Sequence, residues 1–145
     1  MTAAEALQQG AAELAEVLCT AGFEFAATRA GRSSGGEFAS GAYRRGDRWL
    51  ELHVRGSLGL VTYGIAEARL AHEDFVRAVR AIYAAEGEPE YPGFSHCALE
   101  AFQHLRADLV RFGFPFLSGS DEEFRALERW LQDHPKANGL AALER

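Results

Sequence analysis

The sequence predicts an α+β fold: an N-terminal helix, a four-stranded antiparallel β-meander, then three helices packed mainly on one sheet face. Two observations support this prediction. Apolar and polar residues alternate with a period of two through much of residues 23–64, as in strands with one buried face. Before and after that region, apolar residues recur every three or four positions, as in amphipathic helices. The connections between strands are too short for parallel crossovers, so neighbouring strands should run antiparallel.

The first helix should extend from Thr2 to about Cys19. Thr2 and Glu5 have the spacing of a capping box, in which each side chain bonds the backbone amide of the other residue. Gly22 suits the left-handed conformation that ends many helices. The residues expected to face the core are Leu7, Leu14, Val17 and Leu18.

A hairpin over residues 49–64 should form the centre of the sheet. Gly56 and Ser57 fit a two-residue type II′ turn, which places Val54 opposite Gly59. Two strands, near residues 23–27 and 38–44, should precede it, with residues 30–36 as a mobile loop. One hairpin face is then almost wholly apolar. The other face carries Trp49, Glu51, His53, Arg55, Leu58, Leu60 and Thr62. This second face is too apolar to be fully solvated, so we expect a chain segment or a partner subunit to cover it partly.

Three helices are expected after the sheet, near residues 73–83, 95–112 and 120–134. Glu73 and Asp74 suit the first turn of one helix, and Ser120 and Glu123 form a second capping box. Residues 136–145 have a weak helical pattern and should be frayed or docked on a partner. No repeat or second domain is evident, so residues 1–145 should form a single domain.

Composition limits the functional classes. The chain has 145 residues and a net charge of −6, and no apolar run approaches the ~20 residues of a membrane span. The N-terminus carries an acid and no base, unlike a secretory signal. Two cysteines are too few for a disulfide framework, which favours a reducing cytoplasm. No metal or other cofactor is expected.

The charge is unevenly distributed. Residues 29–55 hold six arginines against three acids, whereas the flanking regions are acidic. Arginines interleaved with aromatic residues can stack on bases, and they are also common at protein interfaces. The acidic pI of about 5.4 makes nucleic acid the less favoured partner of residues 43–55. A solvated strand edge is an equally simple explanation.

Residues 31–35 match the G-x-S-x-G pattern of a nucleophile elbow. That chemistry requires a strand, a sharp turn and then a helix, so that the serine is exposed at a helix N-terminus. The segment that follows has the pattern of a strand, so we favour a flexible loop.

Cys97, His104 and Asp108 are the alternative candidates for a reactive or metal-binding site. Cys97 should lie in the first turn of a helix, where the dipole lowers a thiol pKa. However, seven helical residues separate Cys97 from His104 by about 10 Å along the axis, too far for a catalytic pair. His104 and Asp108 supply only two metal ligands, so His53, His72 or His96 would have to complete a site. We therefore favour a half-buried structural cysteine and a solvated polar stripe.

The sequence favours a non-catalytic protein-interaction module, such as an immunity-like or chaperone-like accessory protein, whose partner is another protein or a second copy in a homodimer. The residues expected to form the interface are Tyr43, Arg44, Arg48, Trp49, Glu51, His53, Arg55, Leu58 and Leu60. One alternative is a small enzyme or a ligand- or metal-binding domain that uses Cys97 and nearby histidines. Another is nucleic-acid binding through residues 43–55.

Overall fold

A computed structural model describes residues 1–93 and 97–136 and confirms the α+β prediction. The elements are α1 (Ala3–Thr20), β1 (Glu24–Ser33), β2 (Gly36–Arg45), β3 (Arg48–Arg55), β4 (Ser57–Ile65), β5 (Ala68–Ala71), α2 (His72–Tyr83), α3 (Ala98–Phe112), α4 (Phe114–Leu117) and α5 (Asp121–Asp133). The strands form one sheet in sequence order, each antiparallel to the next. The sheet has five strands rather than the predicted four. The fifth strand, β5, was missed because its four residues are too few to show a period-two pattern.

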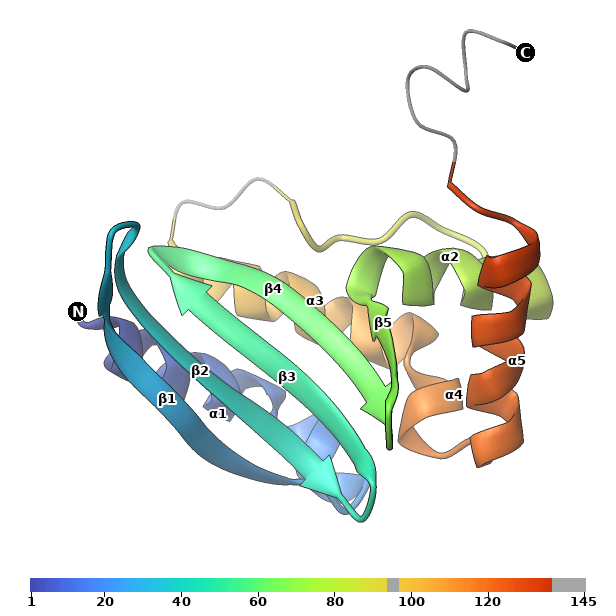
Figure 1. The fold of residues 1–145 in the computed structure, drawn as a ribbon, viewed down its shortest axis with the longest axis horizontal. Helices are drawn as coiled ribbons and strands as arrows, with labels where there is room; N and C mark the ends of the chain where they lie inside the picture. Colours follow the sequence, from blue (N-terminus) through green and yellow to red (C-terminus); the bar gives the residue numbers. More distant parts are fainter. Residues whose placement is uncertain (94–96, 137–145) are drawn as a thin grey trace, which may run out of the picture.

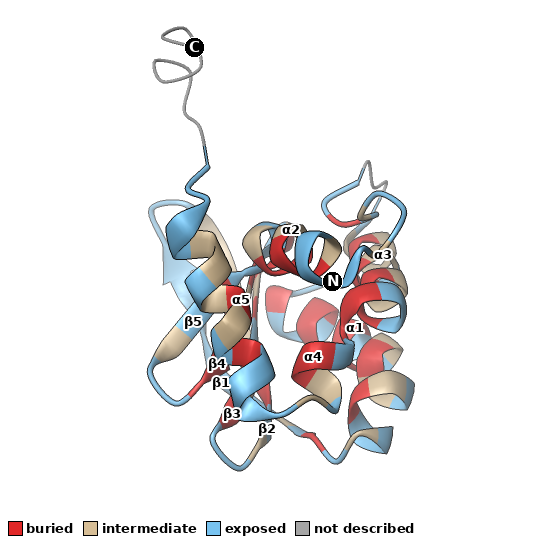
Figure 2. Ribbon diagram, turned by 90° about the vertical axis from the view of Figure 1, so that its right-hand side faces the viewer, coloured by how far each residue is buried: buried red, intermediate tan, exposed pale blue. Residues whose placement is uncertain are grey.

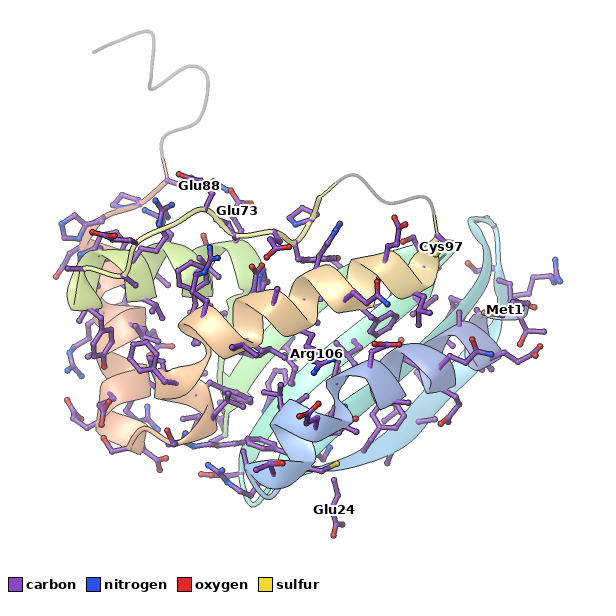
Figure 3. All side chains as sticks on the ribbon, turned by 180° about the vertical axis from the view of Figure 1, so that it is seen from behind. Met1, Glu24, Glu73, Glu88, Cys97 and Arg106 are labelled. Atoms are coloured by element: carbon purple, nitrogen blue, oxygen red, sulfur yellow. The ribbon has the colours of Figure 1, made fainter. Side chains whose placement is uncertain are left out.

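α1, α2, α3 and α4 lie on one side of the sheet, and α5 stands beyond the β5 edge (Figures 1 and 2). Seen from behind, α1 and α3 cross the sheet side by side (Figure 3). α2 follows β5 and packs against α5 at the β5 end of the sheet. Buried segments occur on all five helices, where these helices meet the sheet or one another (Figure 2). The core is therefore built between one sheet face and the helices.

The helix ends follow the predicted capping chemistry. Thr2 and Glu5 form a capping box at α1, and Ser120 and Glu123 form another at α5. Gly22 has φ of +93°, as the end of α1 requires. The short helix α4 occupies the apolar segment that follows α3. The predictions for residues 137–145 lie outside the described residues.

The first hairpin is longer than predicted. Residues 30–33 continue β1 and pair with residues 36–39 of β2, so they are not a loop. The turn at Ser34 and Gly35 joins two strands, and Gly36 takes a φ of +102° that favours glycine. The G-x-S-x-G segment therefore lies between strands and lacks the helix that a nucleophile elbow requires. Glycine and serine obscured the strand pattern because they carry little side chain to pack.

The central hairpin contains a bulge that the sequence did not predict. Leu52 pairs with Val61, but Val54 pairs with Leu58 rather than with Gly59. β4 therefore contributes one residue more than β3 to this stretch. Directly opposed residues share a face, so the bulge turns Leu58 toward the core with Val54.

Candidate interaction surface

The face of the sheet that the helices do not cover is called the outer face here. It is formed by alternate residues of the strands, including Glu24, Ala26, Arg29 and Gly31 of β1, Phe38, Ser40, Ala42 and Arg44 of β2, Trp49, Glu51, His53 and Arg55 of β3, Leu60, Thr62 and Gly64 of β4, and Arg69 and Ala71 of β5. In Figure 1 this face is turned toward the viewer. Leu60 follows the bulge in β4 and is 71% exposed.

Six of the nine predicted interface residues lie on the outer face. They are Arg44, Trp49, Glu51, His53, Arg55 and Leu60. Tyr43 and Leu58 point the other way and are buried in the core. The Tyr43 hydroxyl donates to the Ala11 carbonyl of α1, and burial raises its pKa to about 12. Leu58 is turned inward by the bulge, a register change that alternation alone does not reveal.

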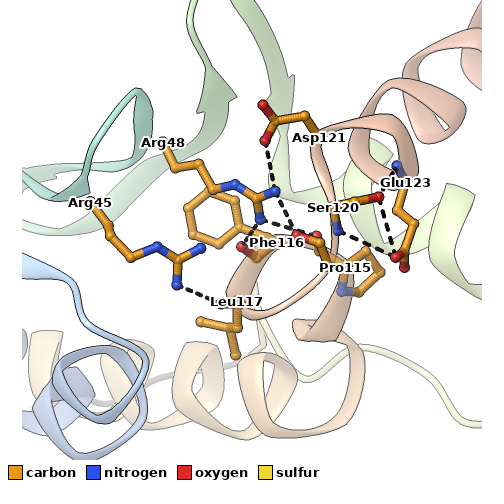
Figure 4. A network of polar contacts seen from close by, with 9 residues as sticks. Arg45, Arg48, Pro115, Phe116, Leu117, Ser120, Asp121 and Glu123 are labelled. Carbon is orange, nitrogen blue, oxygen red and sulfur yellow. Dashed lines mark hydrogen bonds and ion pairs between the residues drawn. The ribbon is translucent and has the colours of Figure 1, made fainter.

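Arg48 is also buried, and it serves as a clamp between the sheet and the helices (Figure 4). Its guanidinium donates to the carbonyls of Phe116 and Gly119 at 2.6 Å each, and to the Asp121 carboxylate at 2.9 Å. Arg45 makes a similar contact, donating at 2.8 Å to the Leu117 carbonyl. These arginines satisfy carbonyls around α4 that would otherwise lack a partner. Arg48 therefore belongs to the structural framework.

Two arginine–aromatic clusters lie on the outer face. At one end, the guanidiniums of Arg29 and Arg55 lie 5.4 and 5.5 Å from the centre of the Phe38 ring. At the other end, Arg69 lies 5.1 Å from the Trp49 ring. These distances are those of cation–π contacts. The contacts hold guanidiniums and rings together on the sheet.

A polar pair lies beside the first cluster. Ser40 Oγ is 2.6 Å from His53 Nδ1, and the His53 ring stacks on Phe38 with centroids 5.8 Å apart. Phe38, Arg29 and Arg69 are absent from the predicted interface. Arg29 lies beyond the strand predicted near residues 23–27, and Phe38 lies in the predicted strand 38–44 but was not assigned to a face. Arg69 was missed because β5 was not recognised. Extending the period-two alternation through residues 29–44 would have placed Phe38 and Arg29 on this face.

Asp108 does not belong to a solvated stripe, contrary to the prediction. Its carboxylate is buried and accepts from His72 Nε2 at 2.8 Å. It also accepts from the backbone amides of Glu90 and Tyr91 at 2.7 and 2.9 Å. The other imidazole nitrogen, His72 Nδ1, is 2.8 Å from the Tyr63 hydroxyl. Burial, with the nearby Asp108 charge, raises the pKa of Tyr63 well above its ordinary value.

This buried network joins α3, α2, β4 and the segment after α2. Since a carboxylate only accepts hydrogen bonds, His72 Nε2 donates to Asp108, and in the neutral imidazole Nδ1 accepts from Tyr63. The polar side-chain groups of Tyr63, His72 and Asp108, called the buried triad here, then have hydrogen-bond partners within the protein. The sequence offered no periodic pattern for this contact, because the three residues come from three separate elements.

Cys97 lies at the start of α3, near Met1 at the same end of the molecule (Figure 3). It is exposed, so the prediction of a half-buried structural cysteine is wrong. It contributes to the wall of an open pocket of about 630 Å³. This pocket lies between the starts of α1 and α3, the β1–β2 turn and the β3–β4 turn. The charged side chains among its lining residues are Glu37 and Arg55. No histidine occurs among those lining residues, and His96 lies outside the described part of the chain.

The structure does not bring together the described residues of the alternative metal site, which would use His104, Asp108 and a further histidine. Asp108 accepts from His72 and from two backbone amides, and no hydrogen bond between the described side chains of Asp108 and His104 is found. Within residues 1–93 and 97–136, no group of three or more His, Cys, Asp or Glu side chains is placed to hold a metal ion.

None of the helices within the described ranges combines the length and the apolar character needed to cross a bilayer. Searches against protein-family models, curated proteins and solved structures returned no match for this sequence.

Proposed function

We propose that this chain is a non-catalytic protein-interaction module that binds its partner through the outer face of the sheet. The observation that carries the proposal is that the helices occupy one sheet face, while the other presents Phe38, Trp49 and Leu60 beside four arginines. Tryptophan and arginine are enriched where protein partners meet. An exposed leucine beside them provides an apolar contact that a partner would desolvate.

Such a module would act as an accessory protein of the immunity-like or chaperone-like kind, in which binding is itself the function. The exposed, unpaired thiols of Cys19 and Cys97 support a reducing compartment such as the cytoplasm. The partner is another protein or a second copy of this chain.

Site-specific photo-crosslinking in cells that express the protein tests the proposal. A photoreactive amino acid at residue 60 samples the outer face, and the same amino acid at residue 110 samples the exposed side of α3. The two positions are matched, because Leu60 is 71% exposed and Val110 is 69% exposed. We expect a discrete adduct, identified by mass spectrometry, from residue 60 and not from residue 110. Equal adducts from both positions, or none from residue 60, would contradict the proposal.

A further inference from the structure

The outer face is locally basic in an acidic protein. It carries Arg29, Arg44, Arg55 and Arg69 against Glu24 and Glu51, so its formal charge is +2. Since the whole chain has a charge of −6, all other residues together carry −8. The positive charge is therefore concentrated on the face that the helices leave open.

The four outer-face arginines also differ from other arginines in their partners. Elsewhere, Arg32, Arg48, Arg77, Arg80, Arg106 and Arg129 each form an ion pair with a carboxylate. No ion pair within residues 1–93 and 97–136 involves an outer-face arginine. Three of the four lie over aromatic rings instead, and Arg55 additionally donates to Ser33 Oγ at 2.8 Å.

This charge pattern discriminates between occupants. A two-fold dimer formed through the outer face would bring the same patch against itself, so a net charge of +2 would face a net charge of +2. Like charges opposed in an interface disfavour the complex. A nucleic acid that extends past the face would meet the acidic remainder of the molecule beyond it.

We infer that the outer face binds an acidic segment of a different protein. This inference rests on the interaction function proposed above. Its carboxylates pair with the two arginine–aromatic clusters, and its apolar residues contact Leu60 between them. Arg55 and Trp49 are six residues apart on β3, so the clusters are separated by about 20 Å along the sheet. An extended segment of about six to eight residues covers that distance.

The test uses a synthetic peptide of about eight residues, with glutamates at both ends and leucines in the middle. Its counterparts are the same peptide with lysines in place of the glutamates, and single-stranded oligothymidine. The full-length chain carries Trp130→Phe, so that the emission of Trp49 reports binding on the outer face. Arg55→Glu removes one of the two guanidiniums over Phe38, and Arg69→Glu removes the guanidinium over Trp49. Arg125→Glu, at an exposed position of α5, is the matched charge reversal outside the face.

We expect the glutamate peptide to bind at least tenfold more tightly than the lysine peptide. Arg55→Glu and Arg69→Glu should each weaken that binding about tenfold, as for the loss of a charge pair at an interface, while Arg125→Glu leaves it unchanged. The proposal is overturned if the glutamate peptide does not bind, if the lysine peptide binds equally well, or if oligothymidine binds more tightly than the glutamate peptide. It is also overturned if all three charge reversals have equal effects.

Failure here is distinguishable from failure of the proposed function. If the acidic partner is wrong but the outer face is an interface, residue 60 still yields its specific photo-adduct. If the outer face is not an interface, that adduct is absent.

Discussion

Replacing Asp108 with asparagine tests the buried triad with the smallest change of shape. One carboxylate oxygen accepts from the Glu90 amide, and the other accepts from both His72 Nε2 and the Tyr91 amide. Asparagine has only one acceptor oxygen, so its amino group must face at least one donor. The variant therefore places two donors against each other inside the protein.

The magnitude follows from what is lost. A hydrogen bond to a charged group contributes about 1.5–3 kcal/mol, and a buried group left unpaired costs a similar amount. We expect Asp108→Asn to lower the free energy of unfolding by about 2 kcal/mol. Asp108→Ala removes all three contacts and should cost about 3–5 kcal/mol, as when one partner of a buried pair is removed.

Urea denaturation followed by circular dichroism measures both values. Asp133→Asn, at an exposed position of α5, is the matched control and should change stability by less than about 0.5 kcal/mol. A double-mutant cycle with Tyr63→Phe should give a coupling energy above about 0.5 kcal/mol, because both groups act on the same imidazole. If Asp108→Asn is as stable as the control, the carboxylate is not held in the network described.

Three other predictions follow from single contacts. The pKa of Tyr43 is raised from 10.0 to about 12, so its stabilising effect is complete below pH 10 and lost as the pH rises toward 12. In urea unfolding between these pH values, Tyr43→Phe should lose about 1–2 kcal/mol less than the native chain; identical losses would contradict this. Arg48→Met should cost at least about 2 kcal/mol by leaving carbonyls unpaired, whereas Arg44→Met changes stability by under about 0.5 kcal/mol; equal effects would refute the clamp. A Cβ at Gly64 would lie 2.0 Å from the Trp49 ring, so Gly64→Val should displace the ring and shift its emission to the red when it is the only tryptophan; unchanged emission would show that the ring lies elsewhere.

Local rules predicted the features that depend on neighbouring residues. The two capping boxes form because the interacting groups lie three residues apart, whatever the rest of the fold does. The buried stripe of α3, including Phe102, Leu105 and Leu109, follows from helical periodicity in the same way. The antiparallel order of the strands follows from the short connections between them.

The errors arise where a distant contact decides the outcome. Arg48 is a charged residue at the start of a strand and would be expected to be exposed. It is buried because its guanidinium donates to carbonyls some seventy positions later in the chain. Asp108 looks like part of a polar helix stripe until His72, 36 residues away, is brought to it. The bulge near Leu58 depends on how two strands share their hydrogen bonds, which the alternation of either strand alone does not specify.

The outer face limits its own apolar exposure, and this determines what kind of binding to expect. The Trp49 ring lies against Gly64 and the Phe38 ring approaches Gly31, so both aromatics lie close to the sheet with guanidiniums over them. Leu60 is then the most exposed large apolar side chain on this face, at 71%. Because little apolar area remains for a partner to bury, the arginines must supply much of the attraction.

Attraction between exposed charges is screened over about 10 Å at 0.1 M salt and about 3 Å at 1 M. We therefore expect the affinity of the outer face for its partner to fall steeply between low salt and 1 M salt, in fluorescence titrations of the glutamate peptide. Leu60→Ser should weaken binding by a similar factor at both salt concentrations, because it removes only the apolar contact. An affinity independent of salt would show that apolar burial, and not the arginine clusters, dominates recognition on this face.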